Sequence, residues 1–244
     1  MRPLSVEKMI GVWEKGDLCS PVDRALLLLQ AATPGSSLQD LAELNIGERD
    51  RRLLELREKT IGTRLSCAVK CPACGEDLQF EFDTREIVRP ALPRTTEQLV
   101  SAFEEFSVTF RLPNSRDLAE ALRGPSADDV RMRLLARCLP DVRKSGVPCP
   151  VDELPKSVIA QVCEQMAQSD PQTDVQFSVE CQSCGKGWQA PFDVARFFWA
   201  ETAVRAQRAL SEVHVLALAY GWSEPDILRM SAARREFYLQ MVGE

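Results

Sequence analysis

The chain carries one short sequence twice, KCPACGEDLQFEFD at Lys70–Asp83 and ECQSCGKGWQAPFD at Glu180–Asp193. Each copy contains a CxxCG turn, in which two thiolates converge on one point and the glycine permits a close backbone bend. One such turn supplies half of a tetrahedral site. Two turns supply four sulfurs, which zinc binds at roughly 2.3 Å without leaving a position for water. The repeat therefore predicts one structural zinc ion bound by four cysteines, Cys71, Cys74, Cys181 and Cys184.

Residues of alternating polarity flank both turns. Gln79–Phe82 follow the first turn and Gln176–Glu180 precede the second, a pattern typical of half-buried strands. We therefore expect two antiparallel hairpins related by an approximate two-fold axis, forming a zinc-ribbon-like unit. Two alternatives stay open: a thioredoxin-like redox pair, disfavoured because neither pair lies between a hydrophobic strand and a helix start, and two separate metal sites with outside ligands. The single histidine, His214, lies in an apolar helical pattern and is expected to be a helix residue rather than a ligand.

Helical patterns dominate the rest of the chain. The expected helices are Pro21–Ala32, two helices within Leu38–Gly62 that break near Asn45–Gly47, Ser115–Leu122, Ala127–Leu139, Pro155–Ala167, a long helix from Asp193 to Tyr220, a short one from Ser223 to Met230, and a last one capped by Ser231. Phe106–Leu112 is expected to be a strand, RPALP at 89–93 a linker, and DVRKSGVPCPVDELP at Asp141–Pro155 a loop. The charges at Arg49–Lys59 are expected to form a solvated face with local ion pairs, and Glu104 and Glu105 to lie on a helix.

The long helix carries an apolar stripe from Trp199 to Tyr220, spaced alternately by four and three residues. Such a stripe needs a covering surface. We expect the N-terminal helices of the same chain to supply it, with a coiled-coil or client contact as the alternative.

The predicted fold class is α+β and mainly helical, with two CxxC hairpins and a helical insertion between them. The expected division of the chain is an N-terminal helical segment (1–66), a first knuckle hairpin (67–89), a mainly helical insertion (90–174), a second knuckle hairpin (175–193), and a C-terminal helical segment (194–244) that packs with the N-terminal helices into one compact unit.

Composition excludes several classes of function. A net charge of −6 and a pI near 5.1 disfavour broad binding to nucleic acid, although Arg133, Arg137, Arg143 and Lys144 offer a local basic patch. The absence of a long apolar run argues against a membrane span and a signal peptide. Among the nine cysteines, the five outside the CxxC pairs are expected to be small buried hydrophobes in a reducing compartment. Nucleotide loops and hydrolase motifs are missing, and a closed four-sulfur zinc site has no open position for catalysis, so we expect no enzyme.

The order of these features resembles the family of T-even-phage-type baseplate hub assembly chaperones, in the zinc-bearing version associated with extracellular contractile injection systems. The resemblance rests on LNIGERDRRLLELREKTIG (Leu44–Gly62), CPACGEDLQFEFD (Cys71–Asp83), VTFRLPNSRDLAEAL (Val108–Leu122), CQSCGKGWQAPFDVARFFWAE (Cys181–Glu201) and HVLALAYGWSEPDILRMSAARREFYLQMV (His214–Val242). It covers nearly the whole chain, and the C-terminal tail looks most specific. The zinc site is inferred from the cysteines of this sequence and not from the resemblance.

The resemblance implies a cytoplasmic, non-catalytic assembly chaperone that binds a baseplate hub or spike protein. Four aromatic residues near the C-terminus are candidates for that contact: Tyr220, Trp222, Phe237 and Tyr238. A structural baseplate component and a nucleic-acid-binding zinc ribbon stay as alternatives. The sequence leaves open the identity of the client and the oligomeric state.

Overall fold

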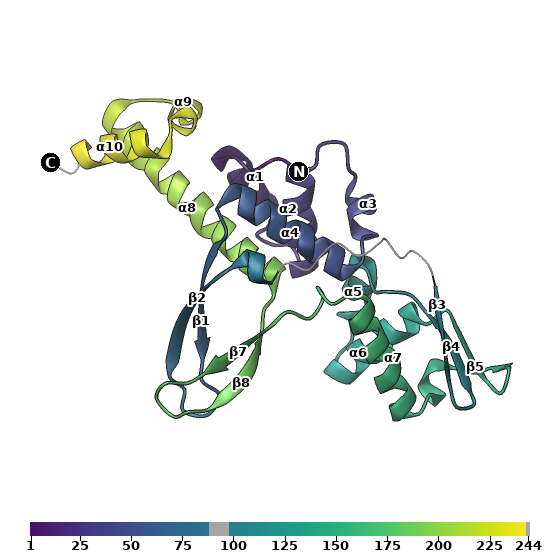
Figure 1. Cartoon of the computed structure of the whole chain (residues 1–244). Coiled ribbons are helices and arrows are strands. Elements are labelled where there is room, and N and C mark those ends of the chain that lie inside the picture. The colour runs from purple at the N-terminus through teal and green to yellow at the C-terminus, as the bar shows by residue number, and fades with distance from the viewer. Residues whose placement is uncertain (88–97, 243–244) are drawn as a thin grey trace.

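The computed structural model describes residues 1–87 and 98–242. A helical body lies at the centre, and a pair of hairpins, an insertion lobe and a helical arm extend from it in three directions (Figure 1). The mainly helical α+β class is confirmed. The linker expected at 89–93 lies outside the described residues.

The body consists of four N-terminal helices and the first half of a long C-terminal helix. These are α1 (Val6–Gly16), α2 (Pro21–Ala32), α3 (Leu38–Ala42), α4 (Ile46–Thr60) and α8 (Val194–Tyr220). The break near Asn45 is confirmed, because the Asn45 side chain accepts the N–H of Glu48 and begins α4. Phe198 and Trp199 of α8 are buried in the same hydrophobic core as the leucines of α2 and α4. The start of α8 therefore completes the body.

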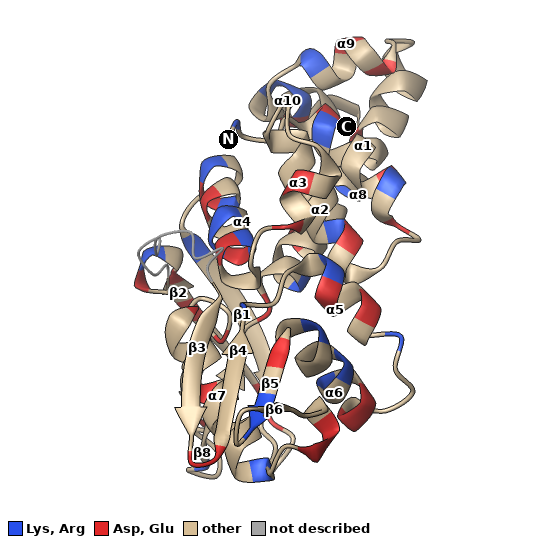
Figure 2. Ribbon diagram, turned by 90° about the vertical axis from the view of Figure 1, so that its right-hand side faces the viewer, with Lys and Arg blue, Asp and Glu red and all other residues tan. Residues whose placement is uncertain are grey.

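Acidic and basic residues gather on α4 (Figure 2), and part of this charged face is buried. Arg49, Asp50 and Arg57 have exposed fractions of only 5%, 9% and 3%. Arg57 forms a paired ion contact with Glu201 of α8 at 2.8 and 2.9 Å, and Arg49 donates to Asp50 at 2.7 Å. The expectation of a fully solvated face was wrong for these three residues, because other segments of the chain pack against this side of α4.

The insertion lobe has its own sheet and its own hydrophobic core. The sheet is antiparallel in the order β3 (Leu99–Phe103), β4 (Phe106–Phe110), β5 (Asp141–Lys144) and β6 (Val147–Pro148). The helices of the lobe are α5 (Ser115–Ala121), α6 (Ala127–Cys138) and α7 (Lys156–Ser169), with a short 3-10 turn at Val151–Glu153. Val108, Phe110 and Val162 are fully buried between the sheet and the helices.

Two local expectations for the lobe were wrong. Glu104 and Glu105 do not lie on a helix but in the turn between β3 and β4, where Glu104 has a positive φ of 50°. The segment Asp141–Pro148, expected as loop, forms the β5–β6 hairpin. Strand β5 pairs with β4, which is distant in sequence, and β6 is too short to show an alternating pattern. Periodicity alone therefore does not reveal these two strands.

The lobe meets the body through backbone and polar contacts. Ile46 donates its N–H to the carbonyl of Pro113 at 3.0 Å. Gly47 donates to the buried Asp170 carboxylate at 2.9 Å, and a Cβ on Gly47 would lie 1.7 Å from that carboxylate. The joint therefore depends on the small size of residue 47.

The arm consists of the second half of α8 with α9 (Glu224–Arg229) and α10 (Ala232–Val242), which fold back along it. Ile10 of α1 covers Ala206 and Ala209, and Ile227 of α9 packs on Val213 and Leu216. The apolar stripe of α8 is thus covered by the same chain, partly by the N-terminal helices, as expected, and partly by the C-terminal ones. Across residues 1–87 and 98–242, no helix is long and apolar enough to span a membrane.

Candidate metal centre

The two CxxC sequences form two hairpins with the same turn. The strands are β1 (Arg64–Lys70) with β2 (Asp77–Asp83), and β7 (Gln176–Glu180) with β8 (Gly187–Pro191). In the turns, Gly75 donates to the carbonyl of Cys71 at 2.9 Å, and Gly185 donates to that of Cys181 at 2.8 Å. Both glycines have positive φ, 76° and 70°, a conformation that residues with a Cβ rarely adopt.

The hairpins lie side by side, so that the four sulfurs of the repeat meet at one point. The Sγ atoms of Cys71 and Cys184 are 3.6 Å apart, as are those of Cys74 and Cys181. All four lie within 4.8 Å of one another. A tetrahedral ion with bonds of about 2.3 Å requires sulfur separations of roughly 3.8 Å. The geometry and the donor set therefore suit a tetrahedral thiolate-bound metal.

The surroundings of the four sulfurs differ. Cys71 and Cys181 are buried, whereas Cys74 and Cys184 are exposed. The N–H of Cys74 donates to the Cys71 sulfur and is the main reason that the pKa of Cys71 is lowered to about 6. Although the N–H of Glu76 donates to Cys74, the neighbouring sulfurs of Cys71 and Cys181 raise the pKa of Cys74 to about 12. Four sulfurs this close do not all ionise unless a cation balances their charge.

A cluster of phenylalanines supports the contact between the hairpins. The ring of Phe177 lies 4.1 Å from that of Phe82 and 5.7 Å from that of Phe80. Phe192 contacts Phe82 at 5.6 Å and Phe197, in the first turn of α8, at 5.5 Å. The rings therefore link the two hairpins to each other and to the body.

The aspartate that ends each repeat has the same role in both copies. Asp193 accepts the N–H of Arg196 at 2.9 Å and caps α8. Asp83 accepts the N–H of Arg85 at 2.9 Å and caps the 3-10 turn Thr84–Glu86. The Arg85 side chain also holds the pKa of Asp83 well below its usual range. The repeat thus specifies a hairpin followed by a helical start.

Other residues singled out in the sequence lie apart from the sulfurs. His214 is exposed on α8. Three cations of the proposed basic patch are ion-paired: Arg137 with Asp117 at 2.9 Å, Arg143 with Asp141 at 2.9 Å, and Lys144 with Glu105 at 3.2 Å. These pairs reduce the charge available to a phosphate backbone.

The cysteines outside the pairs fit the expectation of small buried hydrophobes only in part. Cys138 is buried, and desolvation raises its pKa to about 12. The others are partly exposed: Cys19, Cys67, Cys149 and Cys163.

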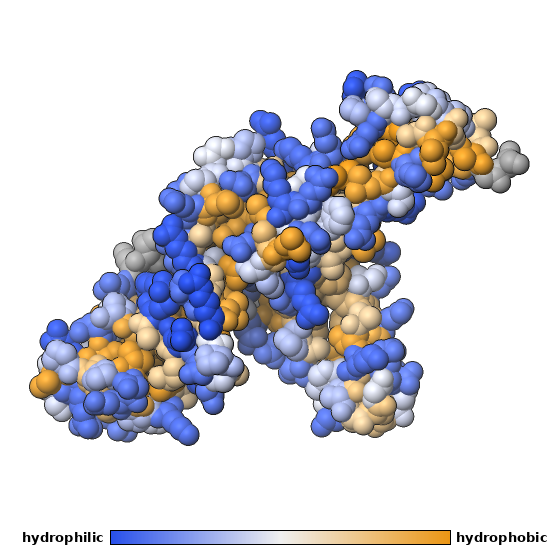
Figure 3. All heavy atoms as spheres, turned by 180° about the vertical axis from the view of Figure 1, so that it is seen from behind, coloured by the Kyte–Doolittle hydropathy of each residue, from blue (hydrophilic) through white to orange (hydrophobic). Residues whose placement is uncertain are grey.

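The four aromatic residues predicted for partner binding lie together on the arm. Tyr220 stacks on Trp222 at 4.5 Å, and Tyr238 contacts Trp222 at 4.9 Å and Phe237 at 5.8 Å. Phe237 is 60% exposed, and Tyr220 is 37% exposed. Hydrophobic atoms run along the arm toward its tip (Figure 3), and Met241 adds to the exposed apolar surface there. We call Tyr220, Trp222, Phe237, Tyr238 and Met241 the arm patch.

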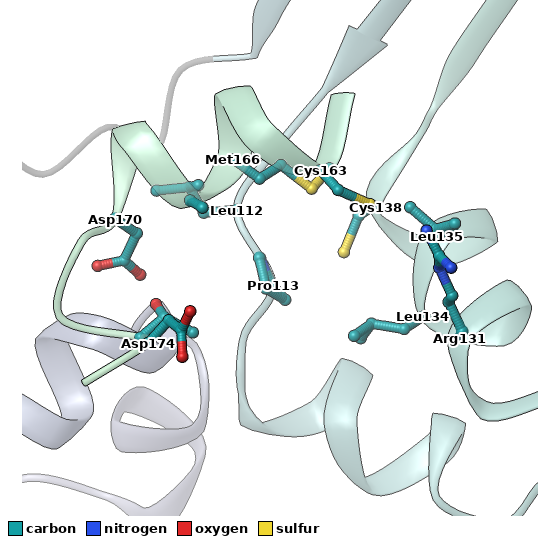
Figure 4. A pocket seen from close by; sticks show the side chains of 12 residues that line it. Leu112, Pro113, Arg131, Leu134, Leu135, Cys138, Cys163, Met166, Asp170 and Asp174 are labelled. Atoms are coloured by element: carbon teal, nitrogen blue, oxygen red, sulfur yellow. The ribbon is translucent and has the colours of Figure 1, made fainter. Parts of the chain in front are cut away.

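Sequence reasoning did not find a pocket between α6 and α7. Its volume is about 210 Å³, and Leu112, Leu135 and Met166 are among the side chains that line it (Figure 4). Residues from three separate segments line this pocket, so no local sequence motif predicts it.

The family of T4 bacteriophage base plate proteins matches the chain over residues 27–199. No curated protein and no solved structure matches the chain. The matched residues include the four cysteines, the described part of the insertion lobe and the body from the second half of α2 to the start of α8, whereas α1 and the tail from His214 to Val242 lie outside them. Because the match spans well over half of the sequence, the chain belongs to the T4 bacteriophage base plate protein family.

Proposed function

We propose that this protein is a non-catalytic, cytoplasmic assembly chaperone that binds a hub or spike component of the baseplate of a contractile injection system or phage-like tail. The observation that carries the proposal is membership in the base plate family over residues 27–199. The order of sequence features, which resembles that of hub assembly chaperones, supports the finer role.

We also infer that Cys71, Cys74, Cys181 and Cys184 hold one structural zinc ion. The sulfur separations of 3.6 Å and the all-thiolate donor set support this choice of metal. Zinc would supply a cross-link between segments more than 100 residues apart, 113 in the case of Cys71 and Cys184. With four protein ligands it would keep no open position for water, which supports a role in folding rather than in catalysis.

The arm patch is the proposed contact surface for the client. It combines aromatic rings, which dominate binding energy at interfaces, with the flexible side chain of Met241. Phe237 and Met241 are 60% and 54% exposed, so a partner can bury them without unfolding the arm. A chaperone must release its client, and a patch of this limited size suits a transient contact.

The proposal is tested by expressing a tagged copy from its native operon and comparing the proteins that it retains with the contents of finished particles. We expect it to retain a hub or spike protein and to be absent from the particle. Phe237→Ser should lose the client. The matched control is Val204→Ser, which removes an apolar side chain 65% exposed on α8 outside the arm patch. Retention of neither hub nor spike protein by the unaltered chain would refute the proposal.

A structural component of the baseplate is the second candidate, and membership in a family of base plate proteins favours it directly. It predicts the same partner but a fixed number of copies in the purified particle. Quantitative mass spectrometry of the particle separates the two roles.

A further inference from the structure

The pocket between α6 and α7 is a recess with a buried floor. Leu112, Leu135 and Cys138, which lie at its base, are at most 6% exposed. Leu134 of α6 and Met166 of α7 are half-buried and face the space between the helices (Figure 4). The two helices therefore leave a gap above the hydrophobic core of the insertion lobe, and this gap is open at the surface.

The size and lining of the pocket suit one apolar ring. Its volume is about 210 Å³. An apolar cavity of about 150 Å³ in another protein binds benzene, and a buried water needs two to four polar partners. Because leucine, methionine, cysteine, proline and alanine side chains form most of the wall, the pocket suits an aromatic side chain better than a cluster of water.

Charged groups of opposite sign lie at the two ends of the pocket. Arg131 lies at one end, and Asp170 and Asp174 lie at the other (Figure 4). Asp170 is buried and accepts the Gly47 N–H, whereas Asp174 is exposed and accepts from the Gln176 amide. Within the described part of the chain, neither Arg131 nor Asp174 forms an ion pair. Neither charge is therefore balanced by an opposite charge among these residues, and each can attract a charged group of a partner.

We propose that this pocket anchors one aromatic side chain of the client, on a segment with an acidic residue toward Arg131 and a basic residue toward Asp174. The inference rests on the proposed function for the existence of a client. A buried aromatic anchor provides binding energy, and the flanking charges orient the segment and select against the reversed charge order. This contact is separate from the arm patch, because the pocket lies on the insertion lobe and the arm patch lies on the helical arm.

The test uses synthetic peptides with one central Trp between Glu and Lys, made in both charge orders, and a matched set with Ala in place of Trp. Binding is measured by titration calorimetry, and the Met166 methyl is followed by NMR. Ala167→Trp fills the pocket from its exposed rim on α7. The control is Ala136→Trp, which places the same ring at an exposed position of α6 that does not line the pocket.

We expect one charge order of the Trp peptide to bind and to shift the Met166 methyl. Affinity should fall at least about tenfold in Ala167→Trp, less in Arg131→Gln and Asp174→Asn, and not at all in Ala136→Trp. Any of three results would overturn the proposal. These are equal binding of the Trp and Ala peptides, undiminished binding of the Trp peptide to Ala167→Trp, and no binding of the Trp peptide at millimolar concentration. The proposal would also be overturned if the protein self-associates and both Ala167→Trp and Phe237→Ser abolish this self-association. That result would show that a second copy of the chain occupies the pocket.

Failure of the pocket and failure of the proposed function give different results. If only the pocket proposal fails, tagged Ala167→Trp protein still retains the hub or spike protein as the unaltered chain does. If the proposed function fails, the unaltered chain retains neither.

Discussion

The hairpin pair and the insertion lobe show two ways of stabilising a small unit in the same chain. The lobe encloses a core in which Val108, Phe110 and Val162 are at most 1% exposed. The hairpins have five or seven residues per strand, and most of their side chains alternate between exposed and half-buried. Two such ribbons bury too little apolar surface to be stable alone, whereas a metal can supply the missing free energy.

The two units also differ in how they join the body. The hairpins continue directly into α8 and the 3-10 turn, with phenylalanines filling the junction. The lobe joins at the α3–α4 corner, where Gly47 contacts Asp170 and an isolated bridge pairs Asn45 with Asn114. The comparison predicts that each unit can be damaged while the other stays folded.

The largest effect is expected from removing the metal with a chelator or from Cys184→Ser. Structural zinc contributes apparent free energies of about 10–16 kcal/mol in zinc-finger peptides, so the hairpins should unfold. Hydrogen exchange should become fast at β1, β2, β7 and β8 and stay slow in the lobe. Cys149→Ser, a change at a half-buried thiol of the lobe, is the control. Slow exchange in metal-free hairpins would show that the hairpins do not depend on the metal for their stability.

The converse change is Phe110→Ala in the core of the lobe. Phe110 is 1% exposed, and truncating a buried Phe costs about 3–5 kcal/mol in the free energy of unfolding. Denaturant titration should show the lobe unfolding earlier, while the metal content stays unchanged. Loss of metal together with the lobe would show that the two units fold as one.

A smaller effect is expected from Gly47→Ala at the joint. The added Cβ would lie 1.7 Å from an Asp170 oxygen, so the carboxylate must move and its bond to the N–H is lost. Leaving such a buried group unsatisfied costs about 1–3 kcal/mol. Small-angle scattering should report a changed lobe position with both cores folded. Gly11→Ala, where nothing lies within 4 Å of the new Cβ, should leave the profile unchanged.

The smallest effect concerns the rings between the hairpins. Phe177→Ala removes contacts with Phe80, Phe82 and Phe192. Aromatic pairs contribute about 0.5–1.5 kcal/mol beyond burial, so thermal stability should fall modestly while the metal is retained. Metal loss in this variant would mean that the rings, rather than the sulfurs, bring the hairpins together.

The sequence was most informative where a structure depends on neighbouring residues. The CxxCG turns, the helix break near Asn45, the helix start at Ser223 and the helix Pro21–Ala32 follow local rules and are present as expected. The gathering of four distant sulfurs was also predictable, because half a tetrahedral site requires its other half.

Features that depend on packing between distant segments were not predictable. The sequence predicts Arg49 and Arg57 to be surface residues, because it does not show that Ser115 and Glu201 contact them in the folded chain. The pocket needs α6, α7 and the segment at Leu112 together. For the two arginines the deciding contact comes from a distant part of the chain, 66 residues away for Arg49 and Ser115 and 144 residues away for Arg57 and Glu201.

Metal analysis of the purified protein shows whether the four cysteines hold one zinc ion. Elemental analysis gives the number of zinc ions per chain, and X-ray absorption gives their ligands. We expect one zinc per chain with four sulfurs at about 2.3 Å, and we expect the zinc to be lost when any one of the four cysteines is replaced. A chain that folds its hairpins without metal, or that binds zinc after Cys71 and Cys181 are both replaced, would contradict it.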